Sequence, residues 1–95
     1  LDASSFKGIR LVVRGNEETY GLHLRTGDVT RPWQSYRAEF CAETDWEVVE
    51  LPFSNFLPHR IDVPLNTRKL RRLGLVAIGR QFHAELSVKR LEFYR

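Results

Sequence analysis

The sequence predicts an all-β fold, an antiparallel sandwich of about six strands. Apolar and polar residues alternate in several short stretches, which is typical of strands with one buried face, because successive side chains point to opposite sides of a sheet. Polar turn residues separate most of these stretches, and no stretch has a helical pattern. The longest segment between strands contains Pro52, Pro58 and Pro64, which leave no room for a helix of useful length.

The first half of the chain contains three expected strands. Residues 7–14 and 19–26 alternate, and the turn residues 15–18 between them predict a hairpin. A longer loop leads to a third strand at residues 33–42. The apolar side chains of this third strand are those of Tyr36, Ala38 and Phe40.

A fourth strand is expected at residues 45–51, after a polar turn. It is apolar on both faces, which is usual for a central or covered strand. The irregular segment 52–67 follows. Because aromatic side chains flank its start, we expect Trp46, Phe53 and Phe56 to be buried and to hold this segment against the core.

The last two expected strands lie near the C-terminus. Residues 73–79 form a continuous apolar run, which predicts a buried strand. Residues 80–81 turn the chain, and alternation from Phe82 onward predicts the final strand. Its apolar parity changes near the end, so we expect a β-bulge at residues 89–90.

Composition limits the function. The chain has 95 residues, which fits one domain, and a net charge of +3, which permits acidic partners without requiring them. Cys41 is the one cysteine, so no intrachain disulfide or thiolate metal cage is expected. No apolar run approaches the roughly 20 residues of a membrane-spanning helix.

No catalytic or metal-binding pattern stands out. His23, His59 and His83 belong to separate strands or loops, without the spacing of a zinc site. Asp28 and Asp62 could offer oxygens to calcium, but two scattered acids are weak evidence. We therefore expect no enzyme activity, no metal and no cofactor.

Two sets of residues could bind a ligand. The first is a set of outward-facing side chains on the second and third strands, which could bind a sugar by aromatic stacking and bidentate hydrogen bonds; an ordinary solvated sheet face has the same composition. Its members are His23, Arg25, Trp33, Arg37 and Glu39.

The second set is the basic run Arg68, Lys69, Arg71 and Arg72, which could contact phosphates. Without an aromatic platform beside it, we do not expect nucleic-acid recognition. Charges that discourage edge-to-edge strand pairing are the alternative interpretation.

Ordered pieces of the chain resemble a known family. They are YGLHLRTGD, then YRAEFCAETDWEVVELPFSNF and LGLVAIGRQFHAELSVKRLEFY. This order resembles the complex I intermediate-associated proteins of thirty kilodaltons. The resemblance implies a jelly-roll-type sandwich like galactose-binding domains, which are related in shape to carbohydrate-binding modules. It supplies no binding residue that could be carried over.

The resemblance also implies a role. Mitochondrial members help to build the membrane arm of respiratory complex I, so we expect a non-enzymatic assembly module with a protein partner. Its location would be the mitochondrial matrix in a eukaryote and the cytoplasm in a bacterium. A carbohydrate-binding module and an RNA-associated module remain alternatives.

One departure concerns the start of the domain. Family domains begin with further strands before the counterpart of Phe6, so we expect residues 1–95 to be a single sandwich domain without those strands. Val12 and the strand at residues 45–51 would then be left bare. A further segment, the long loop 52–67 of a smaller sandwich, or a second copy in a homodimer would cover them, and we favour the first or the last.

Overall fold

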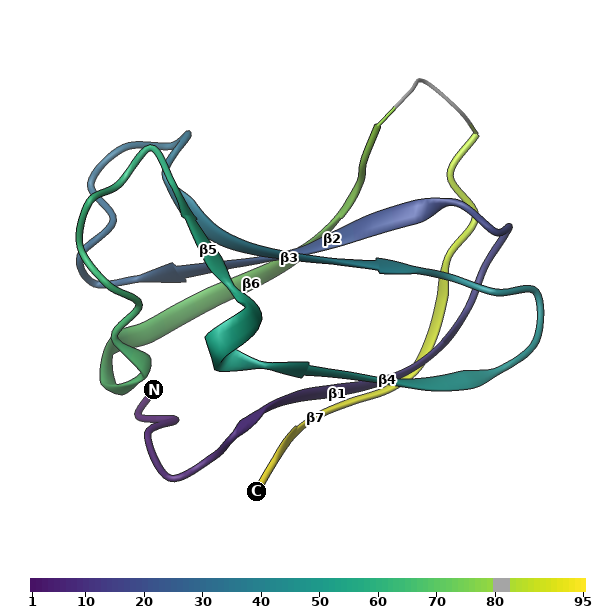
Figure 1. Cartoon of the computed structure of the whole chain (residues 1–95), viewed down its shortest axis with the longest axis horizontal. Helices are drawn as coiled ribbons and strands as arrows, with labels where there is room; N and C mark the ends of the chain where they lie inside the picture. The colour runs from purple at the N-terminus through teal and green to yellow at the C-terminus, as the bar shows by residue number, and fades with distance from the viewer. Residues whose placement is uncertain (80–82) are drawn as a thin grey trace.

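The computed structural model describes residues 1–79 and 83–95, and it confirms the all-β sandwich. Two antiparallel sheets have the strand orders β4-β1-β7 and β5-β3-β2-β6 (Figure 1). No helix in the described part of the chain is long and apolar enough to cross a membrane. The strands are β1 (Gly8–Arg14), β2 (Thr19–Thr26), β3 (Ser35–Cys41), β4 (Glu47–Pro52), β5 (Leu57–His59), β6 (Leu70–Ala77) and β7 (Ser87–Tyr94).

The core forms largely from the alternating side chains of the inner strands β1, β2 and β3. Ile9 and Leu11 of β1 are fully buried, as are Leu22 and Leu24 of β2. Because these residues are two apart in each strand, they share one face of their sheet, and the two apolar faces stack. The alternation in residues 7–14 and 19–26 therefore predicted the interior correctly.

The hairpin predicted between the first two strands is wrong. β1 pairs with β4 and β7, whereas β2 pairs with β3 and β6, so the segment 15–18 crosses from one sheet to the other. The Gly15 N–H donates to the Glu43 carbonyl (2.6 Å), and the Glu17 N–H donates to the Ala42 carbonyl (2.8 Å). The segment 15–18 and the β3–β4 connection, which also crosses between the sheets, therefore satisfy each other's backbone groups.

The expectation of a central or covered fourth strand is also wrong, because β4 is an edge strand that pairs with β1 and leaves Val48 exposed. Trp46 just before it is 42% exposed and Val48 is 61% exposed, so the predicted burial of Trp46 is wrong. The Trp46 ring lies on the outer surface, with the Arg14 guanidinium 5.0 Å and the Lys89 ammonium 5.6 Å from its centroid. Cation–π contacts account for an exposed tryptophan here.

Residues 52–67 close one flank of the sandwich. The chain leaves β4 through a 3₁₀ turn, Phe53–Asn55, and enters the short strand β5, which the sequence did not predict (Figure 1). Phe56 is 5% exposed and Phe53 packs partly buried against the core, so both act as the expected anchors. Ile61 and Leu65, in the part of the segment that follows β5, also pack partly buried against the core.

The predicted burial of residues 73–79 is wrong. They belong largely to β6, an edge strand whose pairing partner is β2, and Leu73, Leu75 and Val76 are 38%, 36% and 41% exposed. Leu73 and Leu75 lie across from Leu24 and Leu22, so they share the inward face. The facing sheet ends at β7 and does not cover them fully.

Strand β7 confirms the predicted bulge. Arg90 lies opposite Val12 and Val88 lies opposite Val13, which leaves Lys89 as the extra residue. The strand begins at Ser87, later than the alternation suggested. The turn predicted at residues 80–81 and the alternation at Phe82 lie outside the described residues.

The N-terminal segment is tied down. The Leu1 nitrogen donates to the Leu70 carbonyl (2.8 Å), which places this end beside the start of β6 (Figure 1). The Ala3 N–H donates to the Thr67 carbonyl (2.8 Å), and Ala3 is fully buried. Residues 1–7 thus close one end of the gap between β6 and β7.

Candidate functional site

The structure brings together part of the proposed sugar-binding set. His23 on β2 lies directly across from Arg37 on β3, and Gly21 lies across from Glu39. Residues two apart along a strand share a face, so His23, Arg37 and Glu39 all project from the outer face of the four-stranded sheet. Arg25 continues this face at the end of β2.

Trp33 is not part of the same strand face. Strand β3 begins at Ser35, two residues later than expected, and Trp33 lies in the preceding turn with 56% of its surface exposed. The Gln34 carboxamide oxygen holds this turn by accepting from the N–H groups of Thr30 (3.0 Å) and Arg31 (3.1 Å). The outward positions of β2, β3, β5 and β6 hold no Phe, Tyr or Trp in the described part of the chain, so the sheet lacks the large aromatic side chains on which a sugar stacks.

The surroundings of His23 and His59 lower the pKa of both imidazoles. Burial, and then the positive charge of Arg37 and the proximity of His59, lower the pKa of His23, while Glu39 opposes the shift. His23 Nε2 is buried and has no hydrogen-bond partner among the described residues. Burial and the charges of Arg37 and Arg60 likewise lower the pKa of His59. A lowered pKa favours the neutral imidazole, which can hydrogen-bond a ligand but attracts anions weakly.

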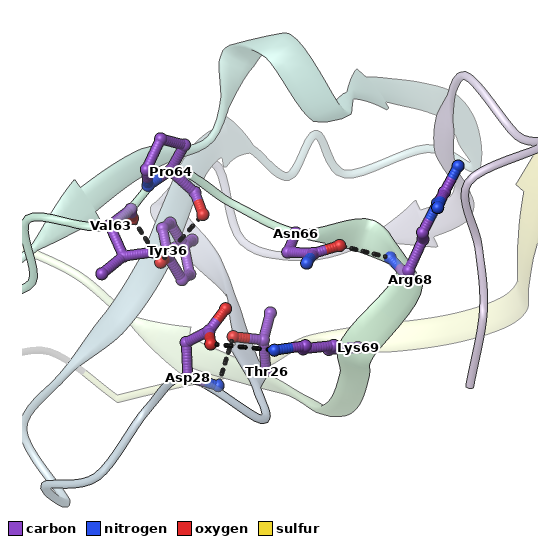
Figure 2. A network of polar contacts seen from close by, with 8 residues as sticks. All are labelled: Thr26, Asp28, Tyr36, Val63, Pro64, Asn66, Arg68 and Lys69. Carbon is purple, nitrogen blue, oxygen red and sulfur yellow. Dashed lines mark hydrogen bonds and ion pairs between the residues drawn. The ribbon is translucent and has the colours of Figure 1, made fainter.

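The basic run divides into two pairs. A 3₁₀ turn, Thr67–Lys69, begins after Asn66, whose carboxamide oxygen accepts from the Arg68 N–H (3.1 Å). Figure 2 shows Lys69 directed toward Asp28 on the neighbouring loop, where Nζ lies 3.3 Å from Oδ1. The first pair of basic residues therefore lies in the turn, and Lys69 ties it to the β2–β3 loop.

The second pair, Arg71 and Arg72, lies in β6 beside the other candidate set. Arg72 pairs with Arg25 of β2, and the two arginines of β6 line a pocket of about 240 Å³ together with Arg25, Thr26 and Val29. The sequence placed Arg25 in one candidate set and the β6 arginines in the other. Strand order, which the sequence did not reveal, is what brings them together.

A separate apolar surface follows the gap between β6 and β7. Leu73 and Leu75 contribute from β6, and Val88, which is 40% exposed, contributes from β7. A cleft of about 100 Å³ lies at one end, between apolar side chains and two arginines. Its lining residues are Leu1, Leu70, Arg71, Arg72, Leu73 and Phe93. The signal in the sequence is the apolar run after RKLRR, which by itself predicts a buried strand.

Catalytic chemistry has little support from the described residues. Among them, no group of three or more His, Cys, Asp or Glu side chains is placed to hold a metal ion. Desolvation, and then the carboxylates of Glu43 and Glu47, raise the pKa of the exposed Cys41 thiol, which makes it a poor nucleophile at neutral pH.

Comparison with known proteins gives one match. The sequence model of the family described as complex I intermediate-associated protein 30 (CIA30) matches residues 1–88. No curated protein and no solved structure matches the chain.

Proposed function

Because the chain belongs to the complex I intermediate-associated protein 30 family, we propose that it binds a protein partner, without catalysis, during assembly of respiratory complex I. The compartment that this proposal requires is the one in which the complex is built, the mitochondrial matrix of a eukaryote or the cytoplasm of a bacterium. The structural observation that supports it best is the exposed apolar edge along β6 and β7.

Strand β6 is suited to receive a further strand. It pairs with β2 on one side, and an edge strand presents backbone N–H and C=O groups on its other side. Leu73 and Leu75 leave more than a third of their surface exposed beside this edge. A partner strand would satisfy the backbone groups and cover both leucines, which is the usual basis of strand addition.

The lining of the cleft indicates the chemistry of the partner. Leu70 and Phe93 offer an apolar contact, and Arg71 and Arg72 border the same space. We propose that the occupant is an extended segment of an assembly partner, with an apolar residue next to an acidic one. Complementary charge would fix its register along β6.

The proposal can be tested by complementation with the full-length protein. In cells that lack the endogenous protein, we expect Leu75→Asp to reduce the amount of assembled complex I on native gels, because a carboxylate at the edge repels an acidic strand and opposes burial. Val48→Asp is the matched control, since Val48 is exposed on the edge strand of the opposite flank.

A photoreactive residue at position 76 identifies the partner in the same cells. We expect cross-links to a complex I subunit or assembly factor. Normal complex I levels with a soluble, folded Leu75→Asp protein would contradict the proposed docking edge. Normal levels in the complete absence of the protein would contradict the assembly role itself.

A further inference from the structure

The pocket at the end of β2 and β6 concentrates positive charge. Three of its five lining residues are arginines, Arg25, Arg71 and Arg72, and the other two are Thr26 and Val29. It opens beside the loop that follows β2, and it shares Arg71 and Arg72 with the cleft at the end of the apolar gap. So many positive charges in one pocket require a compensating negative charge.

A β-bulge creates the concentration. Arg25 pairs with Arg72 and Thr26 pairs with Leu70, so Arg71 is the extra residue between the two pairs. The Arg71 Nε lies 3.6 Å from the position that a Cβ on Gly27 would occupy, so its guanidinium is directed over the loop. Two arginines directly opposite each other are destabilising in an antiparallel pair, and the bulge adds a third.

No described carboxylate neutralises these arginines. Asp28, on the adjoining loop, directs its carboxylate to Lys69 (Figure 2). Arg25 donates to the Arg31 carbonyl (3.2 Å), which carries no net charge. Within residues 1–79 and 83–95, neither Arg71 nor Arg72 makes an ion pair or a side-chain hydrogen bond.

We propose that this pocket binds the phosphate group of a small ligand, either inorganic phosphate or a phosphate monoester. Arginine presents planar pairs of N–H donors that match phosphate oxygens. The Thr26 hydroxyl accepts from the Asp28 N–H (3.2 Å), which leaves its own hydrogen to donate to the anion.

The dimensions of the pocket agree with this assignment. A volume of about 240 Å³ holds a phosphate group and part of the group that carries it. Val29 supplies an apolar wall for that second part. A bound dianion would replace the repulsion between Arg25 and Arg72 by two attractions, so binding would also stabilise the fold.

Thermal unfolding of the purified chain tests the site. At constant ionic strength set by chloride, inorganic phosphate and glycerol phosphate are added in separate series. We expect at least one of them to raise the melting temperature by about 3–6 °C, the size expected at a few times the dissociation constant. The ligand that acts at the lower concentration identifies the source of the phosphate.

Arg25→Gln is the decisive variant, because Arg25 lines this pocket and not the apolar cleft between β6 and β7. We expect it to abolish the phosphate-induced rise. Arg90→Gln is the matched control, since it removes the same charge from β7 on the other sheet and should retain the rise.

A second measurement needs no ligand. In phosphate-free buffer we expect Arg72→Gln to melt above Arg90→Gln, because it removes one of two opposed like charges. The proposal is overturned if neither ligand raises the melting temperature of the wild type, or if Arg25→Gln and Arg90→Gln lose the rise equally. A lower melting temperature for Arg72→Gln than for Arg90→Gln would equally contradict the charge arrangement.

Discussion

The two flanks of this sandwich differ in how they are closed. At one flank the edge strands β4 and β5 are joined by residues 53–56, and Phe56 in this link is 5% exposed. At the other flank the edge strands are β6 and β7, and Leu73, Leu75 and Val88 remain 36–40% exposed. Residues 1–7 close this second flank at one end only.

The difference shows that apolar composition does not decide burial. Residues 73–78 are as apolar as the buried strands, yet they lie at an edge that no described segment covers. The proline-rich segment 52–67 looks like an irregular loop, yet its apolar side chains replace a strand as a cover. What covers each edge determines which flank is stable and which can accept a partner.

The largest expected effect separates the two flanks directly. Phe56→Ala should lower the free energy of unfolding by about 3–5 kcal/mol, because it leaves a cavity in a closed core. Leu75→Ala should lower it by about 1 kcal/mol or less, because the site is already partly hydrated. Urea unfolding measures both. Equal losses would mean that β6 is covered in solution.

A smaller loss of stability is expected when the hydrogen bond between Tyr36 and the loop after β5 is removed. The buried Tyr36 hydroxyl donates to the Val63 carbonyl (2.5 Å), and Figure 2 shows this hydroxyl directed at the loop. Tyr36→Phe should cost about 1–2 kcal/mol, because it leaves that carbonyl without its partner. Faster proteolysis within residues 57–66 should accompany the loss. An unchanged cleavage rate would show that the loop is held by apolar packing alone.

The smallest effect is a pH dependence of the folding stability, which arises from His23 on the outer face of the four-stranded sheet. The folded-state pKa of His23 lies below its unfolded value, so the unfolded chain binds the proton more readily. Stability should therefore be complete above about pH 6.5 and fall as the pH decreases toward the folded pKa. His23→Gln should flatten this part of the profile, whereas His83→Gln, at a side chain that is 87% exposed, should leave it unchanged.

Much of the fold was predictable because alternation reports the inward face of a strand. Strand β2 begins and ends at the predicted residues, and the bulge at Lys89 follows from a change of parity. Pairing was not predictable, since a short polar link serves equally as a hairpin turn or as a crossing between sheets. The segment 15–18 crosses between the sheets, and its backbone N–H groups donate hydrogen bonds to the connection between β3 and β4.

The candidate sites were predictable in part for the same reason. The outward positions of His23, Arg37 and Glu39 follow from alternation, and the register then confirms that His23 and Arg37 are opposite each other. The pocket formed by Arg25 with the β6 arginines depends on β2 and β6 being neighbours, although more than forty residues separate them in the chain. A single sequence carries no signal for that contact.

Hydrogen exchange of the β6 amides tests the central claim most directly. About half of the amides of an edge strand point away from its neighbour. The account predicts that these β6 amides exchange rapidly at every protein concentration, whereas β1 amides, bonded on both sides, exchange only on global unfolding. Protection of β6 that increases with concentration would mean that a second copy covers the edge. Protection equal to that of β1 at all concentrations would contradict the claim that β6 is free to receive a partner.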